Sequence, residues 1–174
     1  MLREEYNFRN CFIMVWSWSF TSFSYYCISF YLKYFKGSIY VNSFLFGIAG
    51  FLGVTTFGVM IQYLSNKSLF TITFFVTFLG SLGFTLTKTN ESLVPVWILL
   101  MVFSVSIQFS LWYYTNIVLF PPLYRTRIFS VWNIIARTFT MMSPMVVELV
   151  DNPMLILWVA AITLMFMSTQ LKQN

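Results

Sequence analysis

The sequence predicts an all-α integral membrane protein, built as a bundle of six membrane-spanning helices. Hydrophobic residues make up 59% of the 174 residues and charged residues only 9%, whereas soluble domains carry roughly 25% charged residues. A soluble domain of this composition would expose large apolar patches. The chain instead offers six apolar stretches of the ~20 residues needed to cross a bilayer. These stretches lack the ~10-residue alternation of barrel strands, which indicates helices.

Short polar breaks divide the chain into these spans. Residues 1–10 are expected to form a short amino-terminal tail and residues 11–174 one transmembrane domain. The predicted spans cover, in order, residues 11–32, 40–63, 68–87, 94–118, 128–149 and 153–171. The first span is interpreted as a retained helix, because it is longer than the ~7–15 apolar residues of a signal peptide and no A-x-A-like site follows it.

The first span carries one face of polar and aromatic residues. Residues three or four positions apart share a helix face, and this spacing groups Ser22, Tyr25, Tyr26 and Ser29. Tyrosine offers an aromatic surface and a hydroxyl group, so the face is a candidate lining for a substrate cavity. Ordinary hydrogen bonding between helices, or an interfacial position of the tyrosines, would use the same residues.

The second span is rich in small residues, with Gly47, Ala49, Gly50, Gly53 and Gly58. Such residues let helix backbones approach closely in lipid, where the hydrophobic drive between helices is weak. We therefore expect this span to pack tightly against a neighbour. A sliding, gating contact would use the same small residues.

Boundary signals frame the third and fourth spans. The break at residues 65–67 precedes the third span, and residues 88–91 separate it from the fourth. The fourth span ends in Trp112, Tyr113 and Tyr114. Aromatic residues near the end of a membrane helix are typical of an interfacial belt.

The fifth span contains the most informative residue, Arg137. A charge near the middle of a span costs at least ~3 kcal/mol, so it usually faces a bundle interior or a watery cavity and marks a functional site. A structural tie to carbonyl groups of other helices is the alternative. Pro144, in the same span, is expected to kink the helix and to free a carbonyl that protein or water must satisfy.

The lysine and arginine residues that flank the spans predict the orientation. Six spans place both termini on the same side of the membrane. That side collects Arg3, Arg9, Lys67, Arg125, Arg127 and Lys172, and the opposite side Lys33, Lys36 and Lys88. The positive-inside rule then puts both termini on the cytosolic side, or on the matrix side if the membrane is the mitochondrial inner membrane.

The residue inventory excludes several classes of protein. The sequence has no histidine, and Cys11 and Cys27 lie far apart. We therefore expect no metal site, no cofactor, no disulfide framework and no enzyme activity. The net charge of +5 comes from scattered basic residues without the basic stripe of a nucleic-acid-binding protein. Membrane lipid is an expected partner, and nucleic acid is not.

Two segments resemble the organic cation, anion and carnitine transporters of the major facilitator superfamily. The run LFPPLYRTRIFSVWNIIARTFTMMSPMVVEL is similar to the tenth-to-eleventh helix region of that family. Its matching residues are Phe120, Pro121, Arg125, Ala136-Arg137 and Ser143-Pro144. Residues similar to the family's seventh helix and the entry to its eighth are Trp18, Tyr25-Tyr26, Gly37, Ile39, Tyr40, Asn42 and Gly47.

The resemblance implies the carboxy-terminal six-helix half of such a transporter, which moves small organic ions by alternating access. The position of Arg137 contributes to charge selectivity in that family, so the substrate is expected to be anionic or zwitterionic. Tyr25 and Tyr26 are implied cavity residues. Because the cavity of this fold lies between two halves, a second six-helix half, encoded separately or supplied by another copy, is the expected partner.

The sequence departs from the family pattern at the charged groups of the cytosolic gate. The family's basic loop should fall at residues 62–67, which read QYLSNK, and only Lys67 survives there. Val118 stands where the family has a glutamate, and another expected glutamate falls near Gly50. Lys67 and Arg125 remain the gate-loop candidates.

Three functions are therefore open. The chain is half of a secondary transporter, or a transport-inactive, transporter-derived subunit of a larger membrane complex such as a respiratory one, or an unrelated six-helix channel or core membrane subunit. The charged residues missing from the gate favour the second function. Arg137 with Tyr25 and Tyr26 favours the first.

Cysteine labelling tests the predicted topology. Cysteines placed at the Met1 end and at the Asn174 end should react equally with an impermeant thiol reagent, because an even number of spans returns the chain to its starting side. Labelling of the two ends from opposite faces of the membrane would contradict the six-span prediction.

Overall fold

The computed structural model describes residues 2–34, 39–87, 93–120, 122–150 and 153–169, and these residues form an all-α protein. The elements are α1 (Leu2–Tyr31), the 3₁₀ turn η1 (Leu32–Tyr34), α2 (Ile39–Tyr63), α3 (Asn66–Leu86), α4 (Val94–Leu119), α5 (Pro122–Thr140), α6 (Ser143–Leu149) and α7 (Pro153–Thr169). The predicted fold class is confirmed as all-α. The backbone of residues 2–10, which we expected to precede the first span, belongs to α1.

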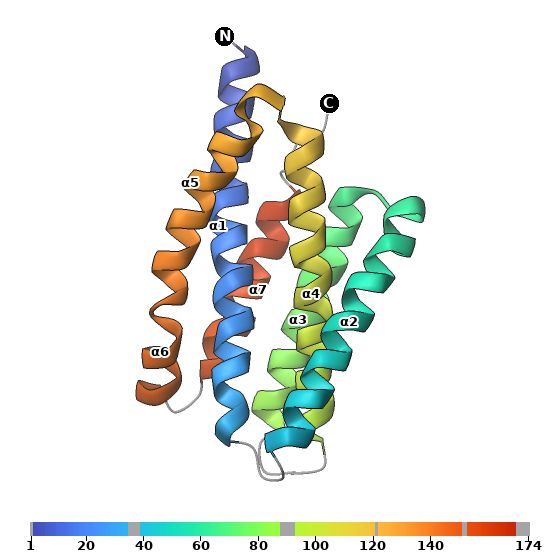
Figure 1. Cartoon of the computed structure of the whole chain (residues 1–174), viewed down its shortest axis with the longest axis vertical. Helices are drawn as coiled ribbons and strands as arrows, with labels where there is room; N and C mark the ends of the chain where they lie inside the picture. The colour runs from blue at the N-terminus through green and yellow to red at the C-terminus, as the bar shows by residue number, and fades with distance from the viewer. Residues whose placement is uncertain (1, 35–38, 88–92, 121, 151–152, 170–174) are drawn as a thin grey trace.

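The helices run alternately up and down the long axis of the bundle, with α6 continuing α5 (Figure 1). The main contacts pair α1 with α5, α2 with α4, and α3 with both α7 and α4. The first turns of α1 and the last turns of α7 point toward the same end (Figure 1). Some of the charges that predict the orientation lie outside the described part of the structure. These are Lys36, Lys88 and Lys172, together with the side chains of Arg3 and Arg9.

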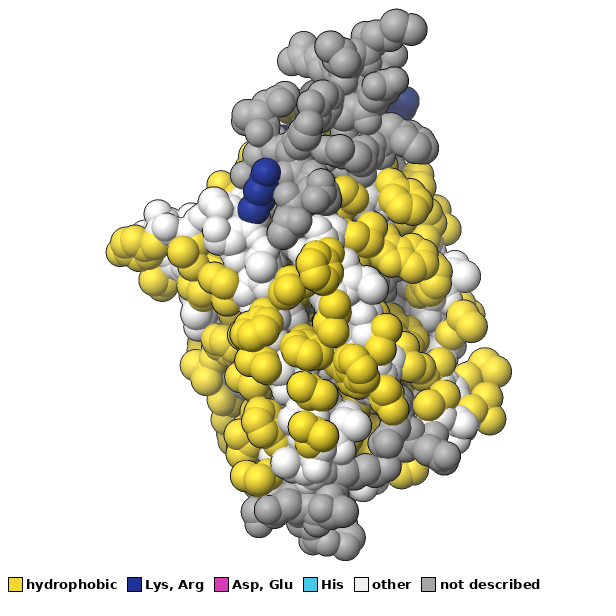
Figure 2. All heavy atoms as spheres, turned by 180° about the vertical axis from the view of Figure 1, so that it is seen from behind, with side chains coloured by type: hydrophobic (Ala, Val, Ile, Leu, Met, Phe, Trp, Pro, Cys, Tyr) yellow, Lys and Arg dark blue, Asp and Glu magenta, His cyan; other side chains and the backbone are white. Residues whose placement is uncertain are grey.

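Among the described residues, three helices, α2, α3 and α4, are long and apolar enough to cross a membrane, and α7 is apolar but shorter over Met154–Met167. Large hydrophobic side chains lie exposed on the bundle surface, Phe44, Phe51 and Leu86 among them. Figure 2 shows such side chains over the face opposite to the view of Figure 1, with the visible basic side chains near one end. A surface this apolar requires hydrocarbon around it, so the protein is membrane-embedded. The other predicted spans stay predictions.

The helix is interrupted within the predicted span 128–149, next to Pro144. Helix α5 ends at Thr140, α6 begins at Ser143, and Pro144 lies in the first turn of α6. Proline has no N–H to donate to the carbonyl four residues before it, which here belongs to Thr140. The Ser143 hydroxyl donates to that carbonyl instead, at 2.7 Å. The carbonyl that Pro144 frees is thus satisfied by its neighbour.

A buried polar network joins α1, α3 and α4. The Gln108 side chain is fully buried; its Oε1 accepts from the Thr21 hydroxyl at 3.2 Å and its Nε2 donates to the Thr77 hydroxyl at 2.9 Å. The Trp112 indole N–H donates to Thr21, and the Thr77 and Ser104 hydroxyls lie 2.8 Å apart. Buried amides are costly unless both ends are bonded, so this network sets how the three helices are rotated.

The glycines of α2 fall on two different faces. A Cβ added at Gly53 would lie 2.6 Å from the Phe103 carbonyl oxygen and 2.8 Å from the Ser106 Cβ of α4. A Cβ at Gly47 or Gly58 would meet no atom within 4 Å. The close approach of α2 to α4 therefore depends on Gly53, whereas Gly47 and Gly58 face outward.

Gly53→Ala should destabilise the bundle by about 1–3 kcal/mol, because overpacking forces α2 away from α4. Gly58→Ala is the matched control and should be neutral or stabilising by up to about 1 kcal/mol, because alanine favours helix without meeting a neighbour. Unfolding followed by circular dichroism in a mild detergent compares the two variants. Equal effects would contradict the assignment of the α2–α4 contact to Gly53.

Candidate functional site

A small cavity of about 120 Å³ lies between α1, α4 and α5. It is lined by Trp18, Ser22, Tyr25, Tyr26, Phe109, Tyr113, Asn133, Ala136, Arg137 and Thr140. Four of the five sequence-predicted cavity residues, Ser22, Tyr25, Tyr26 and Arg137, are thus brought together. Ser29 lies one helical turn beyond Tyr25 and Tyr26 and does not line the cavity.

Helical periodicity accounts for both faces of the cavity. On α1, Trp18, Ser22 and Tyr25 recur at spacings of four and three residues, so they share one face. On α5, Asn133 and Arg137 share a face in the same way. Asn133 and Thr140 were not predicted to line the cavity, although both follow from their spacing of four and three residues to Arg137. Phe109 and Tyr113 belong to α4, and they reach the cavity because α4 packs against α1.

Arg137 lies on the exposed surface of the chain, at the rim of the cavity. Its Nη1 donates to the Tyr26 hydroxyl oxygen at 3.0 Å. Among the described residues, the Arg137 side chain donates no other hydrogen bond. An arginine side chain has five N–H donors in a rigid fork, so most of the donors of Arg137 have no partner among the described residues.

Aromatic rings form the rest of the lining. Trp18 is buried and packs edge-to-face on Phe109 and Tyr113, with ring centroids 5.4 and 5.2 Å apart. Tyr25 packs edge-to-face on Tyr26 and Phe109. The indole N–H of Trp18 has no acceptor among the described residues. The cavity therefore combines a cationic rim with aromatic walls.

The two gate-loop candidates have separate surroundings. Arg125 Nη2 donates to the carbonyl oxygens of Ile117 at 2.6 Å and of Phe120 at 3.2 Å. These carbonyls belong to the end of α4, where a cation is favourable because the last carbonyls of a helix lack partners. Lys67 lies in the first turn of α3. Arg125 thus caps α4, and the described contacts do not join it to Lys67.

An ion pair ties η1, the turn that directly follows α1, to α6. Lys33 Nζ lies 2.8 Å from Glu148 Oε1, and both side chains are about half exposed. The pKa of Lys33 lies above its usual value, mainly because its ammonium donates a hydrogen bond to Glu148. Exposed pairs of this kind contribute little to stability. The pair does bring together two residues that the predicted topology places on the same side of the membrane.

No protein-family model matches the sequence, and no curated protein is significantly similar to it. The resemblance to organic-ion transporters therefore rests on the matching residues of the sequence alone.

Arg125→Leu should destabilise the bundle by about 1–2 kcal/mol, because it removes a charged donor from two carbonyl groups at the end of α4. Arg127→Leu is the matched control: Arg127 is exposed and two residues away on the same helix, and its loss should change stability by less than about 0.5 kcal/mol. Chemical unfolding in detergent measures both. If Arg127→Leu costs as much as Arg125→Leu, the capping role is wrong.

Proposed function

We propose that this chain is one half of a secondary transporter for small organic anions or zwitterions, completed by a second membrane-embedded half. The observation that carries the proposal is the position of Arg137. Its guanidinium sits at the rim of a partly polar cavity, is hydrogen-bonded to Tyr26, and remains exposed on this chain. A second body of protein over this face would enclose the cavity.

The cost of exposing a guanidinium to hydrocarbon supports a covering partner. An arginine within a membrane pairs with protein groups or faces water, because direct contact with lipid is expensive. Here one donor is used and the others need acceptors. A carboxylate fits this need, since it accepts two parallel hydrogen bonds from the planar fork. Among the described cavity residues none is acidic, so the acceptor comes from the substrate or from the partner.

The pattern of helix contacts also supports a transporter half. The bundle divides into two groups of three helices, α1, α2, α3 and α4, α5, α7, whose members correspond in that order. Under this correspondence the α1–α5 contact matches the α4–α2 contact, and the α3–α4 contact matches the α7–α1 contact. The α1–α4 and α3–α7 contacts map onto themselves, and all of these contacts are present. Helix α1 runs opposite to α4 (Figure 1). Two inverted three-helix repeats within a six-helix half are typical of the major facilitator fold.

In this function the chain's own residues would bind and orient the substrate. Arg137 would hold the carboxylate, and Tyr26 would position the guanidinium through the observed hydrogen bond. Trp18, Tyr25 and Phe109 would pack on the organic part, where aromatic faces offer apolar contact. All six predicted helical passes would span the membrane, with both ends on the cytosolic or matrix side.

The alternative function, a structural subunit of a larger membrane complex, is favoured by a specific observation. Arg125, one of the two remaining gate-loop candidates, is occupied in capping α4. In this function a carboxylate or helix end of a neighbouring subunit would pair with Arg137 permanently. The chain would then bind its partner tightly and move no substrate.

Substitution of Arg137 separates the two functions when uptake and assembly are measured together. Arg137→Ala should lower uptake of a small aromatic carboxylate such as benzoate about 10- to 100-fold, because a charged hydrogen-bonded pair worth about 1.5–3 kcal/mol is lost. Assembly, measured as the yield of complex purified in mild detergent, should stay near that of the wild type. Arg137→Asp should weaken anion preference further, and Arg137→Lys should fail if the contact is bidentate.

Arg127→Ala is the matched control, since it removes one positive charge at an exposed position of the same helix. It should leave both uptake and assembly unchanged. Loss of assembly in Arg137→Ala, with no uptake by the wild type, would decide for the structural subunit. Transport by a purified, monodisperse monomer would contradict the requirement for a second half.

A further inference from the structure

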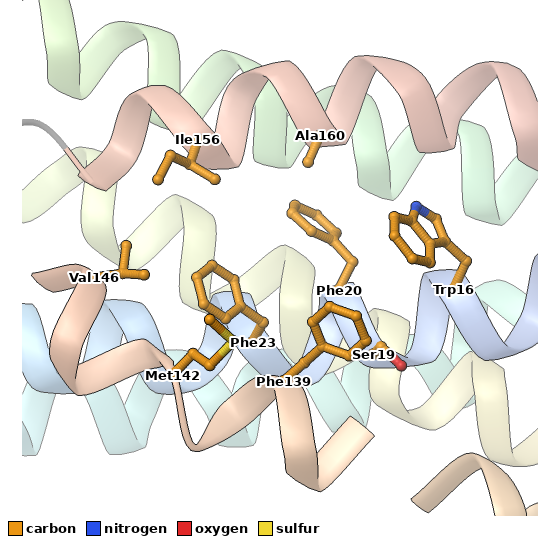
Figure 3. A pocket seen from close by; sticks show the side chains of 9 residues that line it. All are labelled: Trp16, Ser19, Phe20, Phe23, Phe139, Met142, Val146, Ile156 and Ala160. Carbon is orange, nitrogen blue, oxygen red and sulfur yellow. The ribbon is translucent and has the colours of Figure 1, made fainter. Parts of the chain in front are cut away.

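Two hollows on different sides of α1 differ in the groups that they offer to a ligand. The polar cavity between α1, α4 and α5 has a volume of about 120 Å³ and is lined by both Arg137 and Asn133. The apolar groove, of about 280 Å³, lies between α1, the α5–α6 segment and α7. Its lining is apolar apart from Ser19 (Figure 3), whose hydroxyl donates to the Val15 carbonyl at 2.8 Å. Of the two hollows, the polar cavity is therefore the one that can recognise polar groups of a ligand.

Asn133 gives the polar cavity a hydrogen-bond acceptor in a defined orientation. Its Nδ2 donates to the Phe129 carbonyl, one turn earlier on α5, at 3.0 Å. A carbonyl only accepts hydrogen bonds, so this contact places the amide nitrogen on the Phe129 side. The Oδ1 atom accepts no hydrogen bond among the described residues, and it is not a buried atom. The amide oxygen of Asn133 is thus available to a ligand in the cavity.

This acceptor lies one helical turn from the guanidinium-bearing residue. Asn133 and Arg137 are four residues apart on α5, so they share a helix face, and their backbones are about 6 Å apart along the helix axis. An arginine side chain supplies only donors, whereas the Asn133 oxygen supplies only lone pairs. A ligand that matches both residues carries a carboxylate at one end and an O–H or N–H group at the other.

The charge of the lining determines which kind of donor fits. Arg137 is the single charged residue among the described residues that line the cavity, and none of them is acidic. An ammonium group on the ligand would lie near the guanidinium with no carboxylate to offset the repulsion. A neutral hydroxyl group brings no second positive charge. The lining therefore favours an anion with a neutral donor over a zwitterion.

We propose that Asn133 is a specificity-determining residue, which accepts a hydrogen bond from a neutral hydroxyl group of the substrate while Arg137 holds its carboxylate. The inference rests on the proposed function and narrows its substrate class. With the aromatic walls of the cavity, the class is an aromatic carboxylate whose hydroxyl lies across the ring from the carboxylate. If Asn133 served only the structure of α5, it would not distinguish such a ligand from benzoate.

Binding of four related ligands tests the inference on the full chain, purified with its partner in mild detergent and studied by titration calorimetry. Para-hydroxybenzoate should bind about 2- to 10-fold more tightly than benzoate, as expected for one neutral hydrogen bond. Para-methoxybenzoate keeps the oxygen but has no O–H, and it should bind no more tightly than benzoate. Ortho-hydroxybenzoate should also bind no more tightly, because its hydroxyl bonds its own carboxylate.

Substitution of Asn133 assigns the preference to its amide. Asn133→Leu should reduce the ratio of the two affinities, para-hydroxybenzoate over benzoate, to about one, because the acceptor is lost. Asn133→Ala should do the same, and it serves if the leucine variant fails to assemble. Arg137→Ala should instead weaken the binding of both ligands. Ser130→Ala is the matched control, since Ser130 is exposed on the same helix and does not line the cavity; it should keep the wild-type ratio.

Uptake of the same ligands into liposomes separates this inference from the proposed function. Uptake of benzoate and para-hydroxybenzoate with equal efficiency would overturn the role of Asn133 and leave the transport function standing. Binding with the expected preference, but without uptake, would support the role of Asn133 in recognition and contradict transport. Absence of binding by the wild type, or an unchanged ratio in both Asn133 variants, would overturn the inference.

Discussion

The buried amide of Gln108 is the constraint on which the rest of the bundle depends. At membrane depth an unsatisfied amide is costly, and both ends of Gln108 are bonded, one to Thr21 of α1 and the other to Thr77 of α3. These bonds set the rotation of α1 about its axis. Because Thr21 points to α4, the helical period determines which residues of α1 lie on each of its other faces.

Two hollows of opposite chemistry follow from that rotation. One face of α1 carries Trp18 and Tyr26 to the polar cavity, and another carries Phe20 and Phe23 to the apolar groove. The chain from Arg137 to Val146 lines both. The helix is interrupted within this segment, where the Ser143 hydroxyl satisfies the Thr140 carbonyl. Because of the interruption, the one segment can line both hollows. The polar and the apolar space are thereby kept on separate sides of α1.

Much of the candidate site could be predicted because its residues recur with the period of a helix. Ser22, Tyr25 and Tyr26 share a face, and the charge of Arg137 is conspicuous in an apolar span. The same spacing reaches Ser29, which does not line the cavity, because helical periodicity groups residues on a face without saying how far the cavity extends along it. Tyr113 lies on α4, and only the packing of α4 against α1 brings it to the site.

By itself the sequence determined the helical class and the apolar stretches, because composition and hydrophobic runs are local properties of the chain; α2 and α4 cover the predicted spans 40–63 and 94–118. The tertiary structure decided the partners. It separates Gly53, packed on α4, from Gly58, which faces outward, and it assigns Arg125 to the end of α4. It also joins Arg137 to Tyr26 across 111 positions of the chain. Contacts of this kind depend on how helices pack and rotate against one another, which local sequence patterns do not specify.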